Sequence, residues 1–105
     1  MQGQAAEFRS ALPERLELIE SLWRQVRNGQ APALADLERC AHGLAGSGAT
    51  FGFAALGDAA RVLEMAVSPW VGASNALTPA AHAEVGQAVD RFCRSLCAEI
   101  GTQGD

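Results

Sequence analysis

Hydrophobic residues recur every three or four positions in four segments of the chain, with charged and amide side chains between them. This spacing places the apolar residues of each segment on one helix face, and so predicts four amphipathic helices. The first spans about residues 12–26 and ends at Asn28-Gly29. Pro13 suits its first turn, because the N–H that proline lacks would have no partner there. A short helical lead-in at residues 6–10 precedes it.

Glycine and proline separate the remaining three segments, which we expect at about residues 33–48, 53–67 and 79–100. Thr78-Pro79 supplies an N-cap and a first-turn proline for the last of them. Residues 70–77 are the longest stretch without a pattern, and residues 101–105 are expected to be a frayed tail. There is no internal repeat and no strand pattern.

The fold class follows from these stripes, because each apolar face must be buried against another element. Helices of similar length joined by short connections pack as antiparallel neighbours. A chain of 105 residues is long enough for one hydrophobic core. The sequence therefore predicts a single all-α domain over residues 1–105, an antiparallel up-down four-helix bundle with a short N-terminal helical lead-in.

Charge and hydropathy exclude several classes of function. The net charge is −4 and the basic residues are eight dispersed arginines, with no lysine, whereas nucleic-acid binding needs a basic patch. No apolar run approaches the roughly 18 residues that a membrane span needs, and residues 1–6 do not resemble a signal peptide. We expect a cytoplasmic protein with protein partners, and neither nucleic acid nor membrane as a ligand.

Cys93 and Cys97 lie four residues apart and would share a helix face, and together with Cys40 they could in principle offer three thiolates to a metal. No fourth ligand has the spacing of a zinc site, and a free cysteine is commonly a small core residue. No metal site is expected.

His42 is the candidate for chemistry. Projected on a helix, it lies roughly 130° from the centre of the apolar stripe, on the solvent flank. Its helical neighbours are Glu38, Arg39, Ala45 and Gly46. The last two leave a bare patch that would let another protein approach the imidazole. An exposed helical histidine is often an ordinary polar residue, as we expect for His82, and Gly46 and Gly48 could equally reflect close helix packing.

The sequence around His42 resembles the histidine-containing phosphotransfer (HPt) domain. The family pattern is Ala-His-x-Leu-Lys-Gly-Ser, a glycine ten residues after the histidine, and a following helix that contains leucines and ends in Leu-Glu or Leu-Gln. The residues that match in register are His42, Leu44, Gly46, Ser47, Gly52, Leu56, Leu63 and Glu64. Residues 12–16 also resemble a common opening of the bundle, so the resemblance covers nearly the whole chain.

The resemblance implies a phosphoryl carrier that acts through phosphohistidine, and not an independent enzyme. His42 would accept a phosphoryl group from the aspartate of one receiver domain and pass it to another, with Nε2 as the outward nitrogen. The chain would need no cofactor, because the receiver supplies Mg²⁺. Its partners would be response-regulator receiver domains and a hybrid sensor histidine kinase, and it would act as a monomer. Both a free-standing protein and a domain of a hybrid kinase fit the sequence.

One departure from the pattern concerns the phosphate. The family usually has lysine three residues after the histidine, and this chain has Ala45. Arg39 or Arg61 could replace that cation, or both could be ordinary solvated charges, and a carboxylate at Glu64 would not help to bind phosphate. The predicted phosphate and docking surface consists of Ala35, Glu38, Arg39, Ala45, Gly46, Ala49, Arg61 and Glu64 around His42.

Ala45 also keeps a second hypothesis open, in which the chain is a degenerate HPt-fold docking module that binds a receiver or kinase without carrying phosphate. A third is a plain helical oligomerisation domain, in which His42 would be incidental.

Overall fold

The computed structural model describes residues 2–73 and 77–103, and within these ranges every regular element is a helix. The all-α prediction is confirmed. The elements are α1 (Gln2–Ser10), α2 (Leu12–Arg27), α3 (Ala33–Thr50), α4 (Ala54–Val67), the 3₁₀ turn η1 (Ser68–Trp70) and α5 (Pro79–Gln103).

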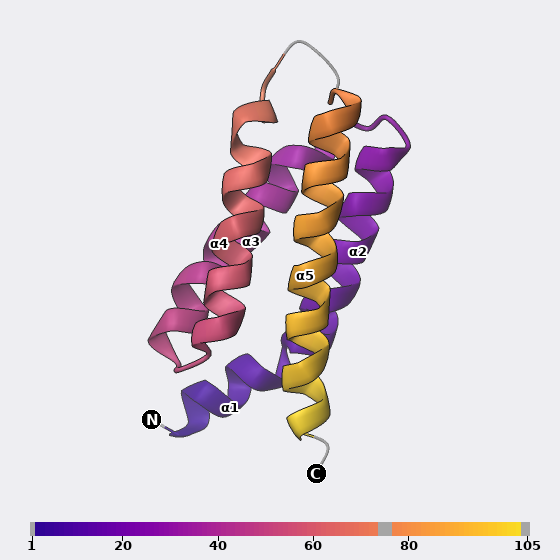
Figure 1. Ribbon diagram of the computed structural model, residues 1–105. Coiled ribbons are helices and arrows are strands. Elements are labelled where there is room, and N and C mark those ends of the chain that lie inside the picture. Colours follow the sequence, from indigo (N-terminus) through magenta and orange to yellow (C-terminus); the bar gives the residue numbers. More distant parts are fainter. Residues whose placement is uncertain (1, 74–76, 104–105) are drawn as a thin grey trace.

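The four longer helices lie side by side, and α1 crosses one end of the group (Figure 1). Helix α3 packs against α2 and α4, and α5 packs against the same two helices, so the four surround one core. The molecule is elongated along the helices, with extents of 44 × 21 × 18 Å. None of the described helices combines the length and the apolar character that a membrane crossing requires.

The helix ends follow local rules that the sequence carries. Pro13 lies in the first turn of α2, and the backbone N–H of Ala81 donates to Oγ1 of Thr78 at 3.1 Å, which confirms the predicted cap of α5. Gly29 and Gly52 follow α2 and α3 with φ of +88° and +87°. Backbone of this left-handed kind favours glycine, because it has no Cβ to clash.

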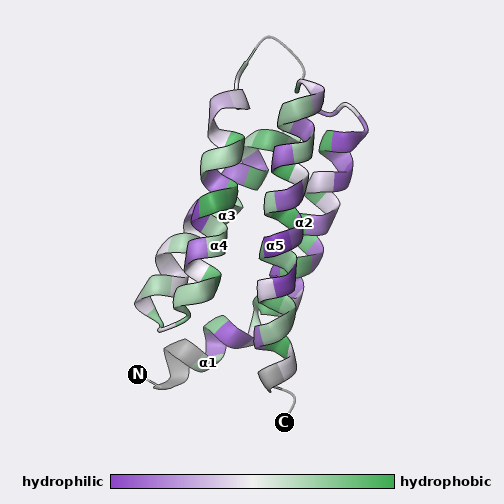
Figure 2. Ribbon diagram, viewed as in Figure 1, coloured by the Kyte–Doolittle hydropathy of each residue, from purple (hydrophilic) through white to green (hydrophobic). Residues whose placement is uncertain are grey.

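The core consists of the predicted apolar stripes. Figure 2 shows hydrophobic and hydrophilic residues alternating along α2 and α5, as expected for helices buried on one face. Among the described residues no polar or charged side chain is buried. The largest side chains that are almost fully buried are Leu12, Ile19, Leu37, Leu56, Leu63, Val67, Val85, Phe92 and Leu96.

Helices α3 and α4 approach closely at a pair of glycines. A Cβ added to Gly48 would lie 3.0 Å from the backbone nitrogen of Gly57 and 3.1 Å from its Cα. A Cβ added to Gly57 would lie 3.2 Å from the carbonyl oxygen of Ala45. The two backbones are therefore in contact, and residues on the flank of α3 face residues on α4.

The structure differs from the sequence prediction at three places. The lead-in is a full helix that starts at Gln2, held by Phe8, whose ring centroid lies 5.3 Å from those of both Phe51 and Phe53. The expected tail continues α5 as far as Gln103, with residues 104–105 outside the described part. The stretch after α4 begins as the turn η1, and residues 74–76 also lie outside the described residues.

Candidate functional site

His42 lies on the flank of α3 that faces α4. Its side chain is 75% exposed, and its Nδ1 lies 2.7 Å from Oε2 of Glu64 on α4, whose side chain is 26% exposed. The close contact of the two helices at Gly48 and Gly57 brings these residues together, although they are 22 positions apart in the sequence. The exposed imidazole is thus held from one side by a carboxylate.

The hydrogen bond to Glu64 constrains the tautomer of the His42 ring. An ionised carboxylate can only accept, so the Nδ1–H of His42 is the donor. In the neutral ring the lone pair then lies on Nε2, which has no hydrogen-bond partner among the described residues. A neutral imidazole nitrogen with a free lone pair is a nucleophile near neutral pH.

A hollow of about 400 Å³ adjoins the imidazole. Arg61 is among the residues that line it, and no carboxylate within the described ranges forms an ion pair with the guanidinium of Arg61. The hollow therefore combines an exposed imidazole, its hydrogen-bond partner and a cationic residue. Its lining residues are His42, Ala45, Gly46, Arg61, Glu64, Met65 and Ser68.

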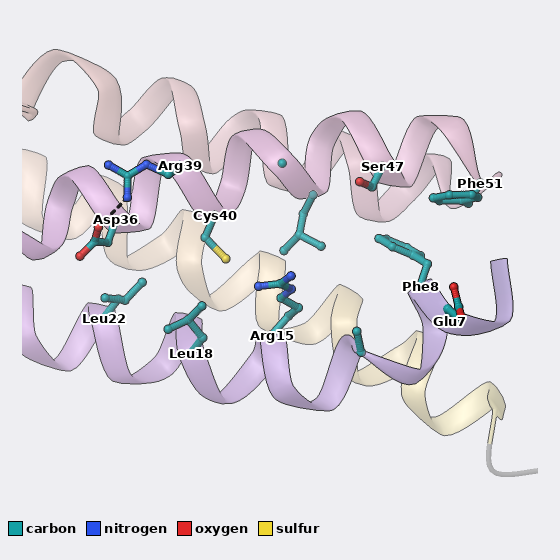
Figure 3. Close-up of a pocket in the computed structure, with 13 residues that line it drawn as sticks. Glu7, Phe8, Arg15, Leu18, Leu22, Asp36, Arg39, Cys40, Ser47 and Phe51 are labelled. Atoms are coloured by element: carbon teal, nitrogen blue, oxygen red, sulfur yellow. Dashed lines mark hydrogen bonds and ion pairs between the residues drawn. The ribbon is translucent and has the colours of Figure 1, made fainter. Parts of the chain in front are cut away.

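Arg39 lies elsewhere. Its Nη1 is 2.8 Å from Oδ1 of Asp36, with both side chains exposed. Figure 3 shows this pair in a groove between α2 and α3, a hollow of about 800 Å³ on the other flank of α3 from α4. Of the two arginines considered as substitutes for the family lysine, the structure places Arg61 beside His42 and turns Arg39 toward Asp36.

The other predicted docking residues divide in the same way. Gly46 is exposed and has open space where a Cβ would be. Ala35 and Glu38 are half-buried and Ala49 is exposed, and none of the three lines the hollow. Ala45 differs from the expectation of a bare exposed patch, because only 6% of it is exposed. It packs against α4 where the backbones are close, so it lines the hollow from its floor.

The comparison with protein families covers most of the chain. The family model of the Hpt domain matches residues 5–95. This chain belongs to the Hpt domain family. Searches of the curated proteins and of the solved structures gave no match. Membership implies phosphotransfer in two-component signalling, in which Hpt domains interact with receiver domains and kinases.

Two features of this Hpt domain were missed in the sequence. Glu64 was expected near the site as a residue of the motif and a carboxylate unfavourable to phosphate, but its hydrogen bond to the ring of His42 was not predicted. Met65, 67% exposed, also lines the hollow. The helical pattern alone indicated that Met65 lies off the buried stripe of α4, but it did not indicate that His42 would be its neighbour.

The three cysteines of the Hpt domain are free, with Cys40 on α3 and both Cys93 and Cys97 on α5. Burial raises the pKa of the Cys40 thiol, an effect that the nearby Arg15 partly offsets. Burial, with the negative charges of Glu20 and Asp90 and the neighbouring Cys97, raises the pKa of Cys93 to about 11. Both thiols are thus protonated and weakly nucleophilic near neutral pH.

Proposed function

We propose that this Hpt domain is a histidine phosphotransfer protein that relays a phosphoryl group between the aspartates of two receiver domains. The observation that supports this most directly is the hydrogen bond from Nδ1 of His42 to Glu64, because it leaves Nε2 as the nucleophile on an exposed ring. The proposal includes an antiparallel up-down order of α2 to α5, which the short connections after α2 and α3 favour.

The transfer step needs little from this chain beyond positioning. Nε2 attacks the phosphorus of the receiver's aspartyl phosphate, the P–N bond forms, and the P–O bond to the aspartate breaks with its electron pair leaving on the carboxylate. The proton on Nδ1 stays in place, and Glu64 stabilises the positive charge that develops on the ring. Mg²⁺ held by the receiver would neutralise much of the phosphoryl charge, so this chain needs no metal of its own. Transfer to the second receiver is the reverse of the same step.

Arg61 is the proposed phosphate contact. A guanidinium presents paired N–H donors that match phosphate oxygens, and Arg61 lines the hollow without a competing carboxylate among the described residues. It would take over the role that the family lysine has at the position of the buried Ala45.

Labelling by phosphorylated receivers encoded in the same genome tests the proposal. We expect phosphate on His42, mapped by mass spectrometry at neutral to alkaline pH, and no label on the His42→Gln variant. His82→Gln is the matched control, since His82 packs against Trp23 with ring centroids 4.9 Å apart and does not line the hollow. Label that survives His42→Gln, or that requires His82, would contradict the proposal.

Two arginine variants extend the same experiment. Arg61→Gln should slow loading of His42 by a factor of about two to five, the size of one exposed charge contact. Arg39→Gln removes the same charge from a side chain that is paired with Asp36, and should leave the rate unchanged. Equal effects of the two variants would indicate general electrostatic attraction and not a contact of Arg61 with the phosphate.

The docking module that carries no phosphate is the second candidate, and the buried Ala45 is the observation that favours it. It predicts that a receiver binds the chain with measurable affinity while His42 takes no label from any phosphorylated receiver. Binding and labelling measured on the same receiver therefore distinguish the two functions.

A further inference from the structure

Both tryptophans of the chain lie toward the end of the bundle opposite to α1. Trp23 is one turn from the end of α2, and Trp70 belongs to η1. This end is formed by the connection between α2 and α3 and by the segment that leads from α4 into α5 (Figure 1). A hollow of about 460 Å³ lies between these segments, named here the end pocket. Its volume is within the range of about 300–1,000 Å³ that small-molecule sites occupy.

The walls of the end pocket are mainly apolar. Its large apolar side chains are Val26 from α2, Leu34 from α3, Trp70 from η1 and Leu77 from the segment before α5. Val26 and Leu34 are buried, and Trp70 and Leu77 are half-buried. A concave site with apolar walls and few polar groups is the usual form of a small-molecule pocket.

The polar side chains of the end pocket favour a negative ligand. Arg27 and His82 line it, and its described lining contains neither aspartate nor glutamate. This is unusual in a chain that has 12 acidic residues and only eight arginines. The four other hollows of the molecule each have at least one acidic residue in their lining. The larger groove between α2 and α3, for example, contains the ion pair of Asp36 with Arg39.

Arg27 is positioned by an aromatic ring and has no acidic partner. Its guanidinium carbon lies 6.0 Å from the centroid of the Trp23 ring, and the imidazole of His82 lies 4.9 Å from the same ring. No carboxylate in the described ranges forms an ion pair with Arg27. A guanidinium beside an aromatic ring keeps N–H donors for other partners. Arg27 can therefore bind an anion in the end pocket.

We infer that the end pocket binds a small carboxylate with an aromatic body. Arg27 would bind the carboxylate, because a guanidinium matches its two oxygens with paired donors. Trp70 would pack against the aromatic body, with Leu34 and Leu77 as the other walls. A phosphate dianion fits less well, since transfer of its charge to apolar walls with one arginine costs more hydration than transfer of a monoanion. His42 does not line this pocket, so the inference is independent of the proposed function.

The two tryptophans give a direct readout of binding. Their indole N–H groups give two signals in a nitrogen–proton correlation spectrum of the full chain. The probes are phenylacetate, phenylpropionate and phenylbutyrate, which have one body and tethers of increasing length. We expect at least one of them to shift the Trp70 signal saturably, with a Kd below about 1 mM. The primary amide of the tightest probe lacks the charge, and propionate lacks the ring, so both should bind at least about fivefold more weakly.

A pair of arginine variants tests the role of Arg27. Arg27→Gln should raise the Kd of the tightest probe about fivefold, the size of one exposed charge contact. Arg24→Gln is the matched control, because it removes the same charge from the same helix at a position that does not line the end pocket. It should leave the Kd within about twofold.

Four outcomes would overturn the inference. They are the absence of saturable binding below about 1 mM for all three probes, equal affinity of the carboxylate and its amide, equal effects of the two arginine variants, and shifts centred on the groove between α2 and α3 instead of Trp70. None of these measurements involves phosphate on His42, so a failure of the relay leaves them unchanged.

Discussion

Replacing Glu64 tests the hydrogen bond that orients the His42 ring. Glu64→Ala removes the acceptor for Nδ1–H, so the neutral imidazole should shift toward the tautomer protonated on Nε2, which is no nucleophile at that atom. Loading from a receiver should slow by about 10–100-fold, as for other partners that orient a histidine. The nitrogen chemical shifts of the ring report the tautomer directly.

Glu64→Gln is the matched variant for this residue. Its side-chain carbonyl can still accept from Nδ1–H, so the tautomer and most of the loading rate should return. A ring that keeps its tautomer in Glu64→Ala would show that the carboxylate does not position His42. A purely structural role for Glu64 would change the melting temperature of the protein without changing the tautomer.

Replacing two glycines of α3 by alanine should change the free energy of unfolding in opposite directions. A Cβ at Gly46 meets nothing within 4 Å, whereas one at Gly48 would meet the backbone of Gly57 at 3.0 Å. Gly46→Ala should therefore raise the free energy of unfolding by up to about 1 kcal/mol through helix propensity. Gly48→Ala should lower it by about 1–3 kcal/mol, because α3 and α4 must separate. Urea denaturation of the two variants measures the contrast, and changes of the same sign would contradict it.

Because Gly48 sets the distance between α3 and α4, the site depends on this helix pair. A separation of the two backbones would also move Glu64 away from His42. Gly48→Ala should therefore reduce the fraction of the Nδ1–H tautomer, while Gly46→Ala should leave that fraction unchanged. The nitrogen chemical shifts of the His42 ring measure this fraction in both variants. A decrease in Gly48→Ala alone would show that the packing of α3 on α4 positions Glu64.

We expect the stability of the whole molecule at alkaline pH to depend on its cysteines. The chain has neither lysine nor tyrosine, and arginine titrates above about pH 12, so thiols are the side chains that titrate between about pH 9 and 11. Burial first, and then nearby negative charge, raises the pKa of Cys93 from 9.0 to about 11. The folded state therefore retains the proton longer than the unfolded state, and the stabilisation present below pH 9.0 is lost as the pH rises through about 11.

We expect the urea midpoint of the wild-type protein to fall over this pH range, and to fall less for Cys93→Ala. Cys97→Ala is the control on the same helix, because that residue is exposed. An equal fall for the wild-type protein and Cys93→Ala would show that another group accounts for the alkaline loss of stability.

The sequence by itself determined the four longer helices of this protein, although not the full length of α1 and α5, because helices depend on spacing and on local rules. Apolar residues three and four positions apart, Pro13 in a first turn and Thr78 as a cap act within a few residues of the chain. The exposure of His42 also follows from its angle to the stripe on α3. The resemblance to the HPt family added the role of that histidine, and the family match over residues 5–95 agrees with it.

Only the tertiary structure decided which residues surround His42. The spacing along α3 indicates the direction of each side chain, but not which neighbouring helix covers a flank or how closely it approaches. The contact of Gly48 with Gly57 sets that approach. It buries Ala45, and α4 brings Glu64 to Nδ1 of His42 from 22 residues away. Met65 and Arg61 join the hollow from the same helix, because a packed helix pair places residues together that no local pattern connects.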